Sequence, residues 1–459
     1  MCNIAGYIGE RNAAPILIEM IRAQEGLNGG FYTGIATLHE GKIHYRKVVG
    51  DLDELLRRTD AAALPGKIGI IHSRTPGDQD YEWAHPFISE RDGEITSAQV
   101  YNGSIGHFKY LDGRRVALAE SLLAEGYSMR SRVAANGKRL ELTDGTRVHI
   151  SDLMCQLISK KICDGAGAVE AMEQSYSEIP AEIVGLMLSV AEPEAIVWAR
   201  INMPMHVGRT DHGIYLASAP QAFPDDAGEP YLLPVFSAGL INKDGFTSAP
   251  FKSEPATVSP LDGKLICRAR SLICEALCRE KAKMPELAKS VKPLFEDADC
   301  KQAACAVYRV LYELKRQGVL RSERTRIPGV FEGLTAPVDQ LWIEERGLIH
   351  KMKLDRRPFE MIKSGQKTFE LRLYDEKRSA VATGDLVEFD CEGETLTRRV
   401  VALHRFAGFA ELYAALPLTR CGYTEADVSA ADPRDMELYY TPEKQAAYGV
   451  VAIELAPIN

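Results

Sequence analysis

The sequence contains no apolar run of the roughly 20 residues that a membrane-spanning helix needs. Its first residues include neither a basic segment nor a long apolar one, so we expect no secretory signal and a cytoplasmic protein. Internal repeats and low-complexity segments are missing too. None of the ten cysteines forms a CxxC pair, which argues against a disulfide framework, and the sequence predicts neither a metal nor a cofactor. These absences exclude membrane, secreted and repeat proteins.

What is present is the composition of an ordinary globular protein. Hydrophobic residues make up 46% of the 459 residues, charged residues 26% and aromatic residues 8%, and this length allows more than one domain. The net charge of −9 argues against a protein that coats nucleic acid over its whole surface. A local basic patch remains open.

The periodicity of the first 250 or so residues predicts one α+β domain with a two-layer sheet core. We expect strands at Asn3–Ile8, Gly34–His39, Lys42–Val48, Gly66–His72, Ser97–Asn102, Val184–Ser189, Ala195–Ile201 and Ile214–Ser218. We expect helices at Ala14–Gln24 and Asp152–Lys161. Between them, residues 136–150 predict a β-hairpin that turns at Asp144-Gly145.

From about Leu261 the pattern becomes helical. RARSLICEALCREKAKM and KQAACAVYRVLYELKRQG predict helices, the second ending at Gly318, and VLRSERTRIPGVFEGLTAP predicts a short basic hairpin. Such an order resembles a winged-helix unit whose basic stretch suits phosphate contacts; a linker domain with a solvated helix face is the alternative. From about Leu348, a strand, a helix and several antiparallel strands closing with YGVVAIEL predict a small β-barrel.

Cys2 requires an explanation, because chain ends fray and a thiol there has little structural use. The run Asn3–Gly9 is mostly apolar and β-prone, which would fix the end of the chain in a sheet. Removal of Met1 by aminopeptidase would leave a thiol and a free α-amine on one residue. The ordinary pKa is about 8.5 for the thiol and about 8 for the α-amine, so the amine can accept the thiol proton close to neutral pH. This predicts a nucleophile that attacks an amide or ester carbonyl through a thioester.

MCNIAGYIGE resembles MCGIVGYIG, the opening of class II glutamine amidotransferases, which are N-terminal-nucleophile hydrolases. Further along, GKIGIIHSRTPGD resembles GIGHTRWATHG, WAHPF resembles NAHPH, and VYNGSIGHF resembles VHNGIIENY. VWARINMPMHVG and YLASAPQAF resemble later segments of the family. The resemblance implies a four-layer α/β/β/α N-terminal-nucleophile sandwich that hydrolyses glutamine to glutamate and ammonia.

The resemblance also implies the catalytic residues. Cys2 is the expected nucleophile, with its own amine as the base. The side-chain amide of Asn102 and the backbone N–H of Gly103 are expected to form the oxyanion hole, where donors face charge that appears only in the tetrahedral state. Taken alone, an Asn-Gly pair is also explained by a simple turn.

Substrate binding is implied at Arg74, Asp152 and His85. Arg74 is expected to hold the α-carboxylate of glutamine, a planar bidentate task that suits a guanidinium. Asp152, in HISDLMCQL, is expected to hold the α-ammonium, and His85 belongs to the WAHPF motif. Alone, Arg74 is also explained as a surface charge and Asp152 as a helix cap.

The sequence departs from the family pattern near the substrate. Arg74 is followed by Thr75-Pro76-Gly77-Asp78, so an aromatic residue and a Thr-His pair are missing, and Asp78 would repel a carboxylate unless it points away. NGGFYTG (28–34) replaces RGYDSAG and loses an arginine, and Asn3 replaces a glycine. A different amide substrate or a silenced site therefore stays open.

At the other end, GQKTFELR (365–372) matches the G-x-K-x-x-E-x-R signature of the ASCH superfamily, small β-barrels related to RNA-binding PUA domains. On a strand Glu370 and Arg372 share a face, and Lys367 in the preceding turn can join them. The resemblance implies a site for RNA or a nucleotide formed by these three residues. The alternative is a salt bridge between Lys367 and Glu370 on the surface.

These patterns predict an amidotransferase domain over 2–253, a helical, winged-helix-like segment over 258–345 and an ASCH domain over 346–459. No phosphosugar isomerase, phosphoribosyltransferase or P-loop motif accompanies them. On one hypothesis Cys2 therefore releases ammonia from glutamine for an unidentified acceptor, on a partner subunit or on the C-terminal barrel. On the other, a degraded amidotransferase fold acts as a regulatory protein that binds RNA or a nucleotide through the ASCH domain.

Overall fold

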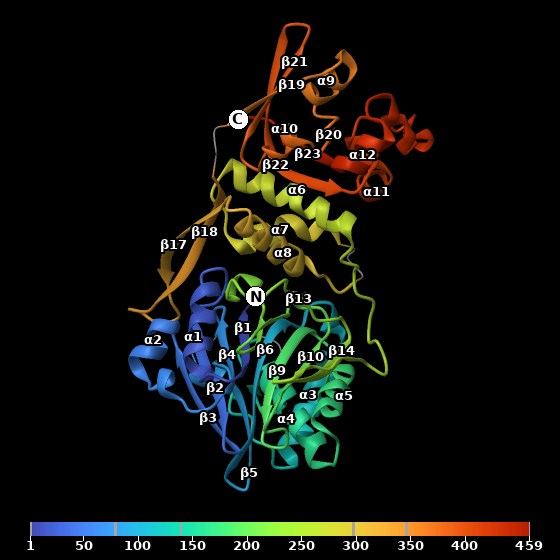
Figure 1. Cartoon of the computed structure of the whole chain (residues 1–459). Helices are drawn as coiled ribbons and strands as arrows, with labels where there is room; N and C mark the ends of the chain where they lie inside the picture. Colours follow the sequence, from blue (N-terminus) through green and yellow to red (C-terminus); the bar gives the residue numbers. More distant parts are fainter. Residues whose placement is uncertain (1, 78–79, 138–139, 296–298, 345–347, 459) are drawn as a thin grey trace. The chain divides into compact units, whose positions relative to one another are not determined.

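The computed structural model describes residues 2–77, 80–137, 140–295, 299–344 and 348–458 (Figure 1). The chain divides into two compact units. The first contains the residues up to Ser259 together with Phe295–Tyr308 and Arg324–Asp339. The second contains Pro260–Leu294, Arg309–Glu323 and the residues from Gln340 onward.

The first unit is built on two sheets. The strand order of one sheet is β13 (Tyr231–Leu232), β11 (His206–Thr210), β12 (Gly213–Ala217), β1 (Asn3–Gly9), β4 (Ile68–Arg74), β2 (Tyr32–His39) and β3 (Lys42–Val49). The order of the other is β15 (Gly245–Phe246), β14 (Ser237–Asn242), β10 (Ile196–Arg200), β9 (Glu182–Ser189), β6 (Glu94–Ser104) and β5 (Phe87–Arg91), with β16 (Ala249–Pro250) also on β14. Neighbouring strands in both sheets are antiparallel.

Helices cover the outer face of each sheet, as Figure 1 shows. The first sheet carries α1 (Ala13–Gln24) and α2 (Leu52–Arg58), and the second carries α3 (Asp112–Ala124), α4 (Ile150–Cys163) and α5 (Ala168–Glu178). Short 3₁₀ turns lie at Ala61–Ala63, Tyr81–Trp83, Gly106–Leu111 and Pro220–Ala222. One apolar core fills the space between the sheets, and a further core lies under each helical layer. The predicted four-layer α/β/β/α sandwich is therefore confirmed.

The start of the chain is held in the middle of the first sheet, because β1 pairs with β12 on one side and β4 on the other. Side chains alternate along a strand. Ile4 and Ile8 consequently face the core between the sheets, whereas Ala5 and Tyr7 face the core under α1. Cys2 thus precedes a fully anchored strand rather than a frayed end.

The elements expected from the sequence are present with ends shifted by a few residues. In the expected hairpin, the amide of Gly145 donates to the carbonyl of Leu142, so the turn spans residues 142–145 and contains the predicted Asp144-Gly145 pair at its end, with Thr143 and Asp144 at its centre. Its paired strands are β7 (Val133–Ala134) and β8 (Thr146–Arg147), so the first of them lies before residue 136.

The helical segment contains α6 (Gly263–Arg279), α7 (Met284–Val291), a 3₁₀ turn at Lys292–Leu294 and α8 (Ala303–Arg316), followed by the hairpin of β17 (Leu320–Pro328) and β18 (Thr335–Ile343). Gly318 takes a positive φ of 71° after α8, as expected for a residue that ends a helix. In the hairpin, Arg324 pairs with Asp339 at 2.7 Å and Arg326 pairs with Asp51. These arginines of the basic stretch are therefore neutralised by carboxylates within the first unit.

The second unit contains a curled sheet. Its strand order is β19 (Ile349–Lys353), β21 (Leu386–Cys391), β22 (Glu394–Phe406), β23 (Val450–Ala456) and β20 (Phe369–Leu373). The helices here are α9 (Arg356–Lys363), α10 (Glu376–Ser379), α11 (Phe409–Ala415) and α12 (Pro442–Tyr448), with 3₁₀ turns at Leu418–Arg420, Val428–Ala430 and Pro433–Leu438. β19 is parallel to β21, and the other pairs are antiparallel. Apolar clusters fill both faces of the sheet, which fits the predicted ASCH barrel.

Among the described helices, none has the length and apolar character needed to cross a membrane.

Candidate active site

The two sheets of the first unit bring Cys2 and Asn102 together. The backbone nitrogen of Cys2 donates to Oδ1 of Asn102 at 3.0 Å, and Sγ lies 3.7 Å from Oγ1 of Thr75. Cys2 precedes β1 and Asn102 lies on β6, so this contact joins opposite sheets across the sandwich. Met1, whose removal the sequence predicts, lies outside the described residues.

The surroundings of Cys2 favour its thiolate. Burial raises the pKa of the thiol, but a hydrogen bond and positive charge from His72, together with the charge of Arg74, outweigh burial and lower the pKa to about 6. A cysteine in such surroundings is largely ionised at neutral pH, and the thiolate is the form that attacks. The side chain is therefore prepared for nucleophilic chemistry.

The side chain of Asn102 has two ends with different partners. While Oδ1 accepts from Cys2, Nδ2 lies 3.4 Å from Oγ of Ser218. This second contact is long, so an oxygen that gains negative charge can compete for the amide N–H. The next residue, Gly103, has no room for a side chain, because a Cβ atom there would lie 2.2 Å from the carbonyl oxygen of Glu182.

A network of amides and one hydroxyl occupies the position where the family pattern has a glycine and an arginine. Nδ2 of Asn3 donates to the carbonyl oxygens of Gln24 and Asn28. The hydroxyl of Tyr308 donates to Oδ1 of Asn3 at 3.1 Å and accepts from Nδ2 of Asn28 at 3.0 Å. Asn3 and Asn28 therefore depart from the family together, and Tyr308 of α8 connects them beside the nucleophile.

Arg74 is a buried cation held by aromatic rings. Its guanidinium carbon lies 5.0 Å from the ring centre of Tyr32 and 5.6 Å from that of Trp83, and the residue is 9% exposed. Trp83 comes from the WAHPF segment, so it supplies from another loop the aromatic residue missing after Arg74. Among the described residues no carboxylate forms an ion pair with Arg74; Asp78 lies outside them.

His149 contacts Arg74 from the start of α4. Nη2 of Arg74 lies 3.1 Å from Nε2 of His149, and Nδ1 of His149 accepts from the backbone amide of Ser151 at 3.1 Å. Partial removal from water, together with the positive charges of Arg74, His72 and Arg147, lowers the pKa of His149 well below its ordinary value. The imidazole is therefore neutral at physiological pH.

His85 and Asp152, the other predicted substrate residues, lie deeper. The His85 ring stacks on His72 with centroids 3.8 Å apart, and His85 is 1% exposed. Burial, with the charge of His72 next, lowers its pKa well below the ordinary value. Asp152 accepts from the amide of Ser131 at 2.9 Å and from Gln156 at 3.1 Å, and burial raises its pKa. Both residues support the wall of the site, and their roles in binding stay predictions.

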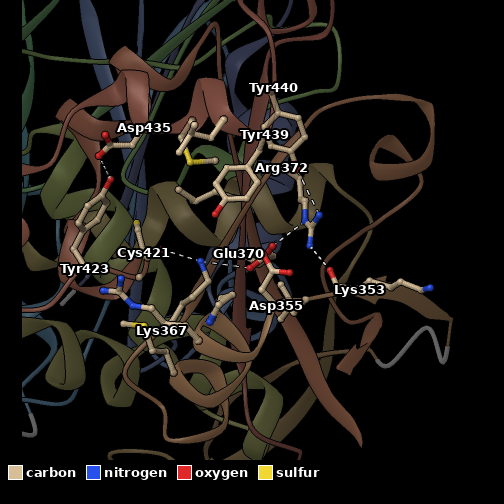
Figure 2. Close-up of a pocket in the computed structure, with 18 of the residues that line it drawn as sticks. Lys353, Asp355, Lys367, Glu370, Arg372, Cys421, Tyr423, Asp435, Tyr439 and Tyr440 are labelled. Carbon is tan, nitrogen blue, oxygen red and sulfur yellow. Dashed lines mark hydrogen bonds and ion pairs between the residues drawn. The ribbon is translucent and has the colours of Figure 1, made fainter. Parts of the chain in front are cut away.

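In the second unit the three residues of the GQKTFELR motif come together (Figure 2). Nζ of Lys367 lies 3.4 Å from Oε2 of Glu370, and Nε of Arg372 lies 2.8 Å from Oε1. Lys367 also donates to the carbonyl of Cys421 at 2.7 Å. The side chains of Lys367 and Glu370 are 7% and 5% exposed, so the salt bridge of the alternative interpretation is present but is buried rather than on the surface.

These residues line a cavity of about 760 Å³, a size typical of small-molecule sites. Its aromatic lining consists of Tyr413, Tyr423, Tyr439 and Tyr440. Its cationic lining consists of Lys353, Arg357, Lys367 and Arg372. Its acidic lining consists of Asp355, Glu370, Asp390, Glu392, Asp427 and Asp435. Carboxylates therefore outnumber cations in the lining.

Within the described residues there is no group of three or more His, Cys, Asp and Glu side chains placed to hold a metal ion.

Comparison with known proteins separates the two ends of the chain. Residues 352–459 match the family model of the ASCH domain. The N-terminal half is similar to curated glutamine–fructose-6-phosphate aminotransferases. One from Pyrococcus horikoshii is 30% identical over 54% of this chain and 37% of its own length, and one from Mesorhizobium japonicum is 27% identical over 59% and 38%. The chain combines a class II glutamine amidotransferase domain with an ASCH domain.

The chain spans less than two fifths of the length of these curated relatives. Among solved structures, it is similar to the glutamine phosphoribosylpyrophosphate amidotransferase from B. subtilis, with 15% identity and a TM-score of 0.46 over 84% of this chain and 81% of that one.

Several residues of the amidotransferase site were not predicted from the sequence. Trp83 lies in the segment WAHPF and His149 in HISDLMCQL, but no local pattern in either segment indicates a contact with Arg74. Tyr308 lies far along the chain, inside a segment that the sequence marks only as helical. Their positions follow from strand pairing and loop paths, which periodicity does not encode.

Proposed function

We propose that the amidotransferase domain hydrolyses L-glutamine to L-glutamate and ammonia through a thioester on Cys2. The observation that supports this most is the contact of the Cys2 nitrogen with Oδ1 of Asn102 beside an activated thiol. After removal of Met1, this nitrogen becomes the α-amine, which Oδ1 would orient. The similarity to glutamine–fructose-6-phosphate aminotransferases suggests glutamine as the substrate.

In the proposed reaction the Cys2 thiolate attacks the carbon of the substrate carboxamide. The carbonyl electron pair moves onto the oxygen, which Nδ2 of Asn102 and the N–H of Gly103 would stabilise. The C–N bond then breaks as the α-amine of Cys2 delivers a proton to the leaving nitrogen, which yields ammonia and a thioester. Water attacks the thioester, releases glutamate and returns the thiol.

The ammonia is proposed to pass to an unidentified acceptor, on a partner subunit or on the ASCH domain. The second hypothesis from the sequence, a degraded amidotransferase fold that binds RNA or a nucleotide, rested partly on the missing aromatic residue after Arg74. Trp83 and Tyr32 flank Arg74 from other segments, which favours the enzyme hypothesis, although the Thr-His pair is still missing. The ten cysteines are free thiols, which is consistent with a reducing compartment such as the cytoplasm.

We expect the mature protein to release glutamate from L-glutamine and to be labelled at Cys2 by a diazoketone analogue of glutamine. Because the pKa of Cys2 is lowered to about 6, the labelling rate should rise with a midpoint near pH 6 rather than the value of about 8.5 typical of a free thiol. Intact-mass and peptide analysis measure the labelling. Absence of both glutamate release and labelling in protein that lacks Met1 would contradict the proposal.

We propose for the ASCH domain a nucleotide or RNA ligand whose base enters the cavity between the tyrosines. The number of tyrosines and the volume of the cavity favour a planar group. The excess of carboxylates in the lining favours few phosphate contacts. The base, rather than a phosphate chain, would then supply most of the affinity.

Titration with short RNA and with nucleosides at two salt concentrations tests this ligand. Two phosphate contacts would cost RNA about sevenfold in affinity over a fourfold rise in salt, whereas a nucleoside should be insensitive. Tyr439 lines the cavity and is 66% exposed, so its truncation should be tolerated by the fold. Tyr439→Ala should weaken the binding of both RNA and nucleosides. Tyr448→Ala is the matched control, because Tyr448 is exposed but lies outside the cavity lining. Equal binding by both variants, or RNA affinity independent of salt, would refute this assignment.

A further inference from the structure

The contact between Arg74 and His149 contains more hydrogen-bond donors than acceptors. Nη2 of Arg74 points at Nε2 of His149, while the amide of Ser151 points at Nδ1 of the same ring. A guanidinium and an amide can only donate. A neutral imidazole has one nitrogen that accepts and one that carries a proton. One of the two contacts therefore places two N–H groups against each other.

The position of His149 decides which contact this is. His149 is the N-cap of α4, and its Nδ1 accepts the Ser151 amide as an N-cap side chain does. Nδ1 is thus the acceptor, and Nε2 carries the proton. Nε2–H and the Nη2–H groups of Arg74 then converge at 3.1 Å without an acceptor between them. Protonation of the ring would only add another donor.

A second feature of Arg74 also indicates a missing acceptor. Nη1 of Arg74 is buried and has no hydrogen-bond partner among the described residues. It lies beside Gly77, where a Cβ atom would approach within 2.1 Å, so a side chain at position 77 would displace the guanidinium. A buried N–H group without a partner is costly unless an acceptor completes the site.

From this geometry we infer that His149 is a substrate-binding residue whose Nε2–H, together with Arg74, binds the α-carboxylate of the amide substrate. The inference rests on the proposed hydrolysis of glutamine. Carboxylate oxygens accept from several donors at once, so one anion satisfies Arg74 and His149 together. The N-terminal end of α4, a helix of 14 residues, adds favourable potential for the negative charge.

His149 thereby supplies a donor in place of the Thr-His pair that is missing after Arg74. Gly77 stands where the family pattern has the threonine of its Thr-His pair, and a glycine offers no side-chain donor. His149 reaches Arg74 from a different element. The site therefore binds the carboxylate through donors from two elements, Arg74 on β4 and His149 at the start of α4.

The test compares L-glutamine with its α-amide, which keeps the reacting carboxamide but has no α-carboxylate. His149→Asp preserves an N-cap acceptor, so the fold should persist, but its carboxylate occupies the donors of Arg74. We expect this variant to raise KM for L-glutamine about 30-fold or more, with kcat changed less than about threefold. KM for the α-amide should change less than about threefold.

Two further variants make the test specific. His149→Asn keeps an acceptor for Ser151 and an N–H for the substrate, so it should raise KM for L-glutamine less than about fivefold. His212→Asp introduces the same charge at an exposed turn and should change KM for neither L-glutamine nor its α-amide. Thermal unfolding of each variant checks that the fold is kept.

The outcomes separate this inference from the proposed function. If His149→Asp raises KM for L-glutamine and for its α-amide equally, or leaves KM for L-glutamine unchanged, His149 does not bind the carboxylate. The proposed hydrolysis of glutamine would still stand. If wild-type mature protein neither hydrolyses L-glutamine nor reacts with its diazoketone analogue, the proposed function is wrong and the inference falls with it.

Discussion

Replacement of the nucleophile in Cys2→Ala is expected to lower kcat/KM for L-glutamine by at least about 10⁴-fold. The reason is that the thiolate forms the only covalent bond to the substrate in the proposed mechanism, and no other described thiol contacts Asn102. Glutamate release measured by a coupled assay checks the loss. Because Cys2 is small and its replacement leaves β1 intact, the variant should unfold at nearly the wild-type temperature.

Cys163→Ala is the matched control, since Cys163 is a free and exposed thiol at the end of α4. It should keep full activity. A second variant isolates the amine: a lysine inserted between Met1 and Cys2 blocks excision of Met1 and leaves the thiol in an internal residue. This variant should be as inactive as Cys2→Ala. Activity in a protein whose intact mass shows a blocked amine would mean that another group delivers the proton to the leaving nitrogen.

The second large effect is expected for Asn102→Asp. This near-isosteric change keeps an oxygen for the Cys2 nitrogen but removes the N–H of Nδ2, which is the donor proposed for the oxyanion. Loss of one such donor costs about 10²- to 10³-fold in kcat. Because the donor acts on charge that develops only in the transition state, KM should change less than about threefold. Steady-state kinetics measure both quantities.

Asn242→Asp is the control for this substitution. Oδ1 of Asn242 accepts from the amides of Asp244 and Gly245 in an exposed turn, and an aspartate can accept the same bonds. That variant should be indistinguishable from wild type. A decrease of kcat in Asn102→Asp of less than about fivefold would show that Asn102 orients the amine without stabilising the oxyanion.

Much of the fold was predictable because its local patterns are simple. The apolar alternation of β1, with Ile4 and Ile8 on one face and Ala5 and Tyr7 on the other, predicts a strand buried on both sides. The position of Gly318 predicts the end of α8. These features depend on neighbours a few residues away, so the sequence shows them directly.

The sequence was less informative about the substrate pocket. The loss of a local aromatic residue and of a Thr-His pair after Arg74 indicated a damaged site. The structure brings Trp83, Tyr32 and His149 to the guanidinium from three other segments. Comparison of the residues next to Arg74 with the family motif shows which side chains are missing there. It does not show side chains from distant segments that take their place.

The same limit applies behind the nucleophile and in the ASCH domain. Asn3 and Asn28 are departures in the sequence, and the structure shows that the Tyr308 hydroxyl joins their side chains. Glu370 and Arg372 share a strand face by simple alternation, which the sequence predicts. Their burial in a cavity with several tyrosines depends on how distant turns cover the sheet.

The sequence by itself determined that a cysteine follows the initiator methionine, that a buried strand anchors it, and that two known domain patterns lie at opposite ends of the chain. Only the tertiary structure decided which groups surround Cys2 and Arg74. The physical reason is that side-chain periodicity encodes which face of an element is buried, whereas the partners across a sandwich depend on strand order and register. Those are set by the packing of the whole unit.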